Sequence, residues 1–246
     1  LGPGQFVSST LPLDSYCPEY SPDGQWLAYG RFGKEGGQLC SMPAAGGPPV
    51  CIGDAGDSVG CPYWSPDGQW IAFYRRLAED KYFNLYRIRP DGTGLQPLTT
   101  GQEADKNAPE WSPNGTQIAY MVRGSGGGST PPGQLWVMDA DGENAHKVMD
   151  QVYGYTHPYW SPDGQTLLVR GHEEGDSKGV WLAPADGGAP QRVAGTAAGG
   201  FNGLWSPSAD GWPLLLPYYD STTEKRTLYY VRGTGQPLDL LAALDW

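Results

Sequence analysis

Short apolar segments separated by polar turns run along the whole chain, and segments of about five residues are typical of β-strands. Five of them follow a turn sequence, at Gln25–Tyr29, Gln69–Tyr74, Thr116–Val122, Gln165–Val169 and Trp212–Tyr219. A second set has a hydrophobic and aromatic centre, at Leu85-Tyr86, Leu135-Trp136, Val180-Trp181 and Leu228-Tyr229. Helical periodicity is weak, and Leu238–Leu244 is the one segment that fits a short helix. The pattern predicts an all-β fold.

A five-residue motif, Trp/Tyr-Ser-Pro-Asp/Asn-Gly, sets the period of the chain. Its serines are Ser21, Ser65, Ser112, Ser161 and Ser206, which lie 44, 47, 49 and 45 residues apart. A strand ends at each Ser, Pro presets φ for the turn, and Gly tolerates a positive φ. Asp-Gly turns then lead to fourth strands such as Gln96–Thr99 and Gln191–Ala194. A period in the mid-forties is that of a four-stranded propeller blade, so residues 1–246 are expected to form a single β-propeller domain.

Both ends of the chain compete to complete the last blade. Gly2–Ser9 is similar to outer strands elsewhere in the repeat, and Gln236–Leu241 is also suited to this position. We expect five blades, with part of a six-bladed ring as the alternative. The chain begins at Leu1 with neither Met nor a signal peptide, which indicates a processed or excised product.

Composition narrows the class of partner. There are 16 Lys and Arg against 27 Asp and Glu, so the formal net charge is −11. Such a charge disfavours nucleic acid and anionic membrane surfaces, and we expect neither as a partner. No stretch approaches the roughly 20 consecutive apolar residues of a membrane-spanning helix, and Leu214–Leu216 is bounded by Pro213 and Pro217, so no direct membrane insertion is expected. An aromatic content of 12% argues against disorder, and the many Gly and Pro residues are explained by turns.

The five motif copies resemble the TolB-type propeller repeat, also called PD40 or WD40-like. The copies at Tyr20, Trp64 and Trp111 are followed by Ile/Leu-Ala-Phe/Tyr, and the resemblance covers residues 14 to 235. It is specific for the fold rather than for a function, because related repeats occur in periplasmic TolB, in the propellers of prolyl-oligopeptidase-type peptidases and in extracellular sensor domains. These 246 residues include neither TolB's α/β domain nor a hydrolase domain. The resemblance therefore implies a binding or scaffolding propeller.

No set of catalytic residues is apparent. The chain has no Gly-x-Ser-x-Gly motif, and the order of His146, His157 and His172 does not fit a Ser-His-Asp arrangement. The tryptophans recur at fixed repeat positions, which indicates packing between blades. Asp139–Asn144 lacks the bidentate Glu of a calcium loop and is interpreted as a hairpin turn. We therefore expect no catalytic residues, no cofactor and no enzymatic activity.

All four cysteines lie within the first 61 residues. Cys40 and Cys51 flank the turn at Ala44–Gly47 symmetrically, so they face each other on antiparallel strands, where Cβ atoms lie about 4.5–5.5 Å apart and a disulfide is feasible. Cys17 and Cys61 each precede a motif Ser by four residues, at equivalent positions of neighbouring blades. A disulfide between blades is the preferred interpretation of this second pair.

The alternatives for Cys17 and Cys61 are two free thiols, or a zinc or copper site shared with His157 and extended by His172. An even number of cysteines without Cys-x-x-Cys favours an oxidising compartment. Together with the TolB-like repeats, it predicts a periplasmic or extracellular protein.

Successive connections of a blade emerge on opposite faces. The Ser-Pro-Asp-Gly and Asp-Gly turns share one, the turn face, and the longer, variable loops share the other, the loop face. Functional residues concentrate on variable loops that a rigid scaffold holds, so we place the binding site at the channel mouth of the loop face. Its candidate residues are Tyr16, Asp57, Asp105, Lys106, Asn107, Tyr155, His157, Phe201 and Asn202. The aromatic members offer apolar contact area with a polar rim.

The leading expectation is a non-enzymatic binding or scaffolding propeller that engages a protein partner or serves as a subunit of a cell-envelope assembly. One alternative is an extracellular ligand-sensing domain of a larger membrane protein, with a small molecule or glycan as its ligand. The other is a metal site or an enzyme at the channel mouth.

Overall fold

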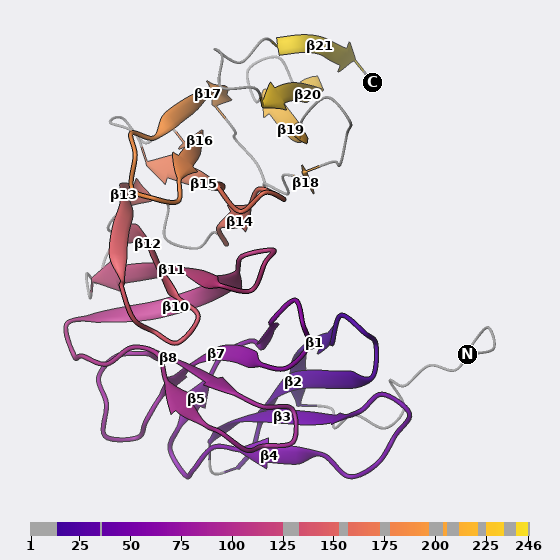
Figure 1. The fold of residues 1–246 in the computed structure, drawn as a ribbon, viewed down its shortest axis with the longest axis vertical. Helices are drawn as coiled ribbons and strands as arrows, with labels where there is room; N and C mark the ends of the chain where they lie inside the picture. The colour runs from indigo at the N-terminus through magenta and orange to yellow at the C-terminus, as the bar shows by residue number, and fades with distance from the viewer. Residues whose placement is uncertain are drawn as a thin grey trace. The chain divides into compact units, whose positions relative to one another are not determined.

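The computed structural model describes residues 14–34, 36–124, 133–152, 157–172, 178–196, 204–205, 212–220, 225–233 and 240–245. Every regular element in these ranges is a β-strand (Figure 1), which confirms the all-β prediction. Within them no helix is long and apolar enough to cross a membrane. The chain divides into two compact units, Leu1–Ser125 with Met138–Ala145 and Gly126–Val137 with His146–Trp246. Each unit is described by itself, and a single propeller domain stays a prediction.

The first unit contains two antiparallel sheets and the start of a third (Figure 1). The first blade has the order β1 (Ser15–Tyr20), β2 (Trp26–Phe32), β3 (Gly37–Pro43) and β4 (Val50–Ile52). In the second blade, β5 (Ser58–Val59) and β6 (Tyr63–Trp64) both pair with β7 (Ile71–Arg76), followed by β8 (Asn84–Ile88) and β9 (Gln96–Pro97). The third blade begins with β10 (Ala104–Trp111) and β11 (Gln117–Gly124). The first two blades follow the predicted order of four consecutive strand positions.

The second unit holds most of β12 (Gly133–Asp139), together with β13 (His146–Val152), β14 (Tyr159–Trp160), β15 (Thr166–His172), β16 (Lys178–Pro184) and β17 (Gln191–Thr196). β13 also pairs with β15 through Val152 and Gly171. A separate antiparallel sheet has the order β18 (Leu204–Trp205), β19 (Trp212–Asp220), β20 (Lys225–Gly233) and β21 (Leu240–Asp245). The predicted second and third strand positions of these repeats are therefore confirmed.

The C-terminal strand corrects one prediction. A short helix at Leu238–Leu244 is wrong, because β21 pairs antiparallel with β20, with Leu244 opposite Leu228. The neighbouring strand supplies hydrogen-bond partners that outweigh a weak helical pattern. The expected fourth strand at Gln236–Leu241 begins later than predicted, and its rival Gly2–Ser9 lies outside the described residues. The number of blades and the closure of the ring stay predictions.

The motif turns share one hydrogen-bond pattern. In the second copy, the buried Ser65 hydroxyl donates to Asp67 Oδ1 at 2.5 Å and accepts from the Trp70 N–H at 2.9 Å. Asp67 Oδ1 also accepts from the Gln69 N–H at 3.0 Å, and Gly68 has a φ of +68°. A Cβ is strained at that φ, which is why the turn needs Gly. The same Ser bonds recur at Ser21, Ser112 and Ser161.

The motif tryptophans fasten successive blades of the first unit. Trp64 Nε1 donates to the Glu19 carbonyl at 3.1 Å, and Trp111 Nε1 donates to the Tyr63 carbonyl at 3.0 Å. Trp64 belongs to a buried cluster that joins the first two blades, with Ala28, Leu39, Val59, Ile71, Phe73 and Ile88. These contacts support the interpretation of the recurring tryptophans as packing residues.

Candidate functional site

On the loop face of the first blade, β1 begins and β2 ends, and this is where Tyr16 lies. Its ring covers Gly30, where an added Cβ would meet a ring carbon at 2.2 Å, and its hydroxyl donates to the Val59 carbonyl of the second blade at 2.5 Å. Burial raises the pKa of Tyr16 to about 12. Tyr16 therefore fastens two blades, and its ring face is left for contact with Phe32, at 4.5 Å between centroids.

Asp57 lies beneath the loop face, with 5% of its surface exposed. One carboxylate oxygen accepts from Arg75 Nε at 2.8 Å and from the Asp54 N–H at 2.8 Å, and the other accepts from the Ala78 N–H at 3.2 Å. Arg75 also pairs with Asp54 at 3.0 Å. Buried charges need such partners, so Asp57 holds two loops together and does not face a ligand.

The third blade contributes three adjacent candidates at the start of β10. Asp105 accepts from the Phe83 N–H at 2.9 Å. Lys106 is 8% exposed and its Nζ donates to the Gly101 carbonyl at 3.3 Å. Asn107 is half-buried. Asp105 and Lys106 thus stabilise the connection between the second and third blades through these hydrogen bonds. Asn107 is the one of the three that the contacts above do not assign to packing.

The remaining candidates belong to the second unit. His157 lies between β13 and β14, and desolvation by burial lowers the pKa of its imidazole. Tyr155, Phe201 and Asn202 lie outside the described residues. Their role at the channel mouth stays a prediction.

A polar pocket of about 260 Å³ opens on the loop face of the first blade. It is lined by Gly33, Lys34, Gly36, Gln38, Gly53, Asp54 and Ala55. Its charged side chains are one cation and one carboxylate, so it suits a polar, uncharged or zwitterionic ligand. None of its residues was among the predicted site residues; the signal for it was the variable loop between the second and third strands.

Two glutamates not marked by the repeat pattern lie on inner strands, the first strands of the blades. Glu19 on β1 and Glu110 on β10 each stand just before the motif aromatic residue, and Tyr63 on β6 holds the same position between them. β6 lies beside both β1 and β10. Burial raises the pKa of Glu110 to about 8, with a further contribution from the charge of Glu19, and burial raises the pKa of Glu19 to about 7. The sequence signal for these two glutamates is the residue just before the motif aromatic residue, compared from one repeat to the next.

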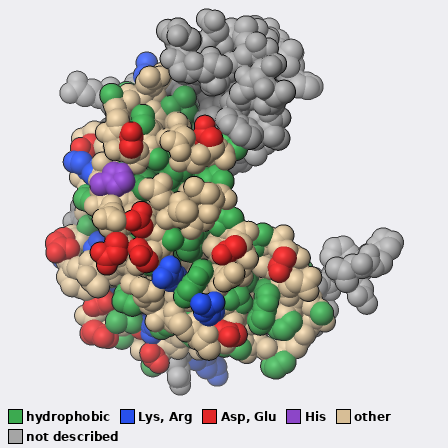
Figure 2. Space-filling model, viewed as in Figure 1, with side chains coloured by type: hydrophobic (Ala, Val, Ile, Leu, Met, Phe, Trp, Pro, Cys, Tyr) green, Lys and Arg blue, Asp and Glu red, His purple; other side chains and the backbone are tan. Residues whose placement is uncertain are grey.

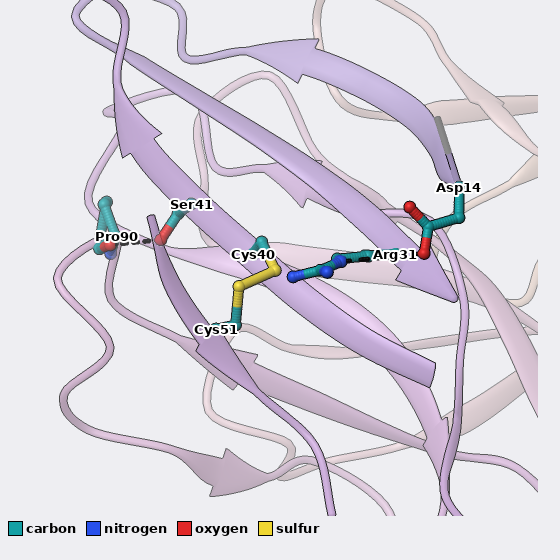
Figure 3. Close-up of a disulfide and its surroundings, with 6 residues drawn as sticks. All are labelled: Asp14, Arg31, Cys40, Ser41, Cys51 and Pro90. Carbon is teal, nitrogen blue, oxygen red and sulfur yellow. Dashed lines mark hydrogen bonds and ion pairs between the residues drawn. A yellow bond between two sulfur atoms is a disulfide. The ribbon is translucent and has the colours of Figure 1, made fainter. Parts of the chain in front are cut away.

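Both predicted disulfides are present. Cys40 on β3 faces Cys51 on β4 in the expected register, with Cα atoms 4.1 Å apart. Figure 3 shows this bond with Arg31 pointing toward it from β2 and with Ser41, whose hydroxyl donates to the Pro90 carbonyl at 2.5 Å. Two disulfides are typical of a protein from an oxidising, non-cytoplasmic compartment.

The second disulfide joins Cys17 of the first blade to Cys61 of the second, with Cα atoms 5.4 Å apart. Both sulfurs are bonded to each other, so neither is a thiolate ligand, and the zinc or copper site with His157 is not formed in this structure. Within the described ranges, no group of three or more His, Cys, Asp or Glu side chains could hold a metal ion.

Charge is dispersed over the surface. Figure 2 shows acidic side chains interspersed with a few basic ones on one face, without a continuous basic area. Two ion pairs at the surface, Asp14 with Arg31 at 3.9 Å and Lys147 with Asp150 at 2.8 Å, show the same mixing.

No family model matches the sequence. Among curated proteins, 86 residues are 34% identical to the uncharacterized peptidase YuxL of Bacillus subtilis, and 80 residues are 34% identical to the Tol-Pal system protein TolB of Zymomonas mobilis. These segments cover 35% and 32% of this chain but 12% and 16% of the two relatives. The chain thus matches less than a fifth of either protein.

Solved structures show the fold. TolB from Acinetobacter baumannii has a TM-score of 0.59 at 16% identity, over 89% of this chain and 51% of that one. An oligogalacturonate lyase in complex with manganese has a TM-score of 0.69 at 15% identity, over 95% and 66%. The β-propeller domain of the trilobed protease from Pyrococcus furiosus, which has an open velcro topology, has a TM-score of 0.64 at 16% identity, over 92% and 71%.

These likenesses and the repeated four-stranded sheets define the class of the protein, a β-propeller. Its repeats are matched in sequence by TolB proteins of several bacteria and in structure by TolB itself. The TolB-like β-propeller (PD40) repeat that the motif predicted is therefore shared by this chain and by parts of these TolB proteins.

Proposed function

We propose that this chain is a non-enzymatic propeller that binds a protein partner through its loop face, in the periplasm or outside the cell. The observation that carries the proposal is Phe32, which ends β2 on the loop face with 61% of its surface exposed. Its ring packs on Tyr16, and Tyr16 is anchored to Val59 of the next blade. An aromatic ring already held in place loses little entropy on binding, which is a property of interface anchors.

The charge of the chain supports a partner with a basic surface. A net charge of −11 attracts such a surface over a long range. Mixed charges beside Phe32, from Arg31 and Asp14, fit the polar rim of a protein interface. The same surface gives no reason to propose nucleic acid or membrane insertion.

The relatives fit a subunit of a cell-envelope assembly, because several are Tol-Pal system proteins. They also include a peptidase, and a lyase is among the structural neighbours. The proposal of a non-enzymatic role therefore rests on the described surface of the first unit, where Tyr16, Asp57 and Lys106 serve packing and Phe32 remains open to solvent.

The test compares Phe32→Ala with Leu95→Ala, a matched loss of an exposed apolar side chain (44% exposed) beyond the Asp-Gly turn of the second blade. Each tagged variant is expressed in the native host, cross-linked in intact cells and recovered, and partner proteins are quantified by mass spectrometry. Phe32→Ala should lower recovery of the main partner about tenfold, which corresponds to about 1.4 kcal/mol of binding free energy, and Leu95→Ala should not. Equal recovery with both variants, or loss with Leu95→Ala alone, would reject the loop face as the binding site.

The polar pocket favours a second candidate function, sensing of a small polar ligand or glycan. Lys34 and Gln38 contribute side-chain donors to it, and Asp54 contributes an acceptor. A thermal-shift screen with neutral mono- and disaccharides and amino acids tests this candidate. A ligand that raises the melting temperature of the wild type but not of Lys34→Ala would support it, and no shift with any ligand of these classes would remove it.

A further inference from the structure

The two disulfides differ in their access to solvent. Cys40 is fully buried, within a cluster of Leu27, Tyr29 and Met42. Cys51 and Cys61, one from each bond, are both half-buried, but Cys17 is exposed on β1, so Cys17–Cys61 is the bond with an exposed cysteine. Thiol–disulfide exchange requires a thiolate to reach one sulfur along the bond axis, so access determines which bond reacts first.

The backbone at Cys17 does not depend on the disulfide. Cys17 has a φ of 48°, and Ala108, at the same repeat position in the third blade, has a φ of 49° without any cross-link. Each is followed by Pro, and the strand register shifts at the same place, between Tyr16 and Glu19 and between Asn107 and Glu110. The bulge at this position therefore forms without a cross-link in the third blade, so the backbone at Cys17 should keep its conformation when the bond opens.

Other contacts hold the same two blades together. The Tyr16 hydroxyl donates to the Val59 carbonyl at 2.5 Å, and Trp64 Nε1 donates to the Glu19 carbonyl at 3.1 Å. Ala28 and Leu39 of the first blade belong to one buried cluster with Phe73 of the second. These contacts do not involve sulfur, so they persist when the disulfide is reduced.

We propose that Cys17–Cys61 is a redox-exchangeable disulfide that a dithiol reductant opens in the folded protein, whereas Cys40–Cys51 is a structural disulfide that stays closed. The thiolate of the reductant attacks one sulfur, a mixed disulfide forms, and the other cysteine leaves as a thiolate that takes up a proton. The second thiol of the reductant then displaces the first cysteine, which is also protonated. Two electrons pass to the cysteines, and the reductant becomes a disulfide.

The consequence is a pair of thiols at the loop face with the fold intact. Because Cys17 adjoins Tyr16, the exchange takes place on the strand whose Tyr16 ring contacts Phe32. The exchange itself is independent of the proposed partner, so it can be measured without one.

The test is graded reduction of the native, oxidised protein by dithiothreitol at neutral pH, with rapid alkylation and peptide mass spectrometry at each time. Alkylation of Cys17 and Cys61 should be at least tenfold faster than alkylation of Cys40 and Cys51. Near-UV circular dichroism should keep its native form when only the first pair has reacted. Comparable rates for both pairs, faster reaction of Cys40–Cys51, or loss of the native spectrum together with the first alkylation would overturn the proposal.

Two double variants separate access from global unfolding. Cys17→Ala/Cys61→Ala places at position 17 the residue that Ala108 provides in the third blade, and it should remain folded and leave the reduction rate of Cys40–Cys51 unchanged. Cys40→Ala/Cys51→Ala should leave the reduction rate of Cys17–Cys61 within about twofold of the wild type. A rise of tenfold or more in either rate would show that the two bonds protect each other and would contradict the assignment.

Discussion

Substitution of Glu110 by Gln should reduce the dependence of stability on pH near neutrality and leave the part that Glu19 contributes. Burial and the neighbouring Glu19 raise the pKa of Glu110 from 4.5 to about 8 in the folded state. Between these pH values the folded protein retains a proton that the unfolded chain has released. The free energy of unfolding of the wild type should therefore fall as pH rises from about 5 to about 8, and it should level off above that range.

The size of the effect follows from the shift. One pKa unit corresponds to about 1.4 kcal/mol, so the full shift is an upper bound of roughly 5 kcal/mol. Glu110 is partly open to solvent, which screens its interactions, and a loss on the order of 2 kcal/mol between pH 5 and pH 8.5 is expected. Gln matches the protonated acid in shape and stays neutral. Glu110→Gln should thus equal the wild type at pH 5 and exceed it by on the order of 2 kcal/mol at pH 8.5.

Urea unfolding followed by tryptophan fluorescence at pH 5, 6, 7 and 8.5 gives these free energies by linear extrapolation. Glu143→Gln, at an exposed position of a turn, is the control and should retain the pH dependence of the wild type. Glu19→Gln should shift the midpoint of the remaining dependence to lower pH, because the charge of Glu19 raises the pKa of Glu110. A wild type whose stability is constant or rises from pH 5 to 8.5, or an unchanged slope in Glu110→Gln, would refute the reasoning.

Two further substitutions, Ser65→Ala and Asp57→Ala, each with a control variant, test the packing of the first unit. Ser65→Ala leaves the Trp70 N–H without its acceptor and should cost about 1–3 kcal/mol in urea unfolding, whereas Asp67→Asn should be nearly neutral because Asn114 makes the same bonds in the third turn. Asp57→Ala leaves the buried Arg75 with the exposed Asp54 as its remaining carboxylate and should cost about 3 kcal/mol, whereas Asp14→Ala breaks a surface pair and should cost less than about 1 kcal/mol. Equal losses for Ser65→Ala and Asp67→Asn would show that the lost acceptor does not decide the first result. Equal losses for Asp57→Ala and Asp14→Ala would show that burial does not decide the second.

The fold was predictable because the turn chemistry repeats. Pro and Gly dictate the backbone of the Ser-Pro-Asp-Gly turn, and the period between copies dictates the number of strands that follow each one. The register at Cys40 and Cys51 was predictable for a similar reason, since a short hairpin fixes which residues face each other. The C-terminal segment was not, because its pairing with β20 depends on a neighbour that its own apolar pattern does not reveal.

The candidate site was harder to predict because the sequence does not show which variable loop residues are used in packing between blades. Positions that do not repeat from blade to blade were expected to be free of packing. Tyr16, Asp57 and Lys106 do not repeat, yet one covers a glycine, one neutralises a buried arginine, and one donates to a carbonyl. Each passage between blades is packed by a different chemistry, so a variable residue there is compatible with a structural role.

A sharper criterion for a binding residue follows from this result. A side chain on the loop face is a candidate binding residue when it meets two conditions. It varies between repeats, and it remains exposed to solvent in the folded structure because it is not used in packing between blades. Phe32 satisfies both conditions. The position varies, because Arg76 takes the equivalent place at the end of β7. The Phe32 ring is exposed to solvent and packs on Tyr16, which is itself bonded to Val59. Tyr16 satisfies only the first condition, because its hydroxyl and one ring face are already used. For this reason the interface experiment should alter Phe32 and leave Tyr16 intact, since loss of Tyr16 would loosen the scaffold and the surface together.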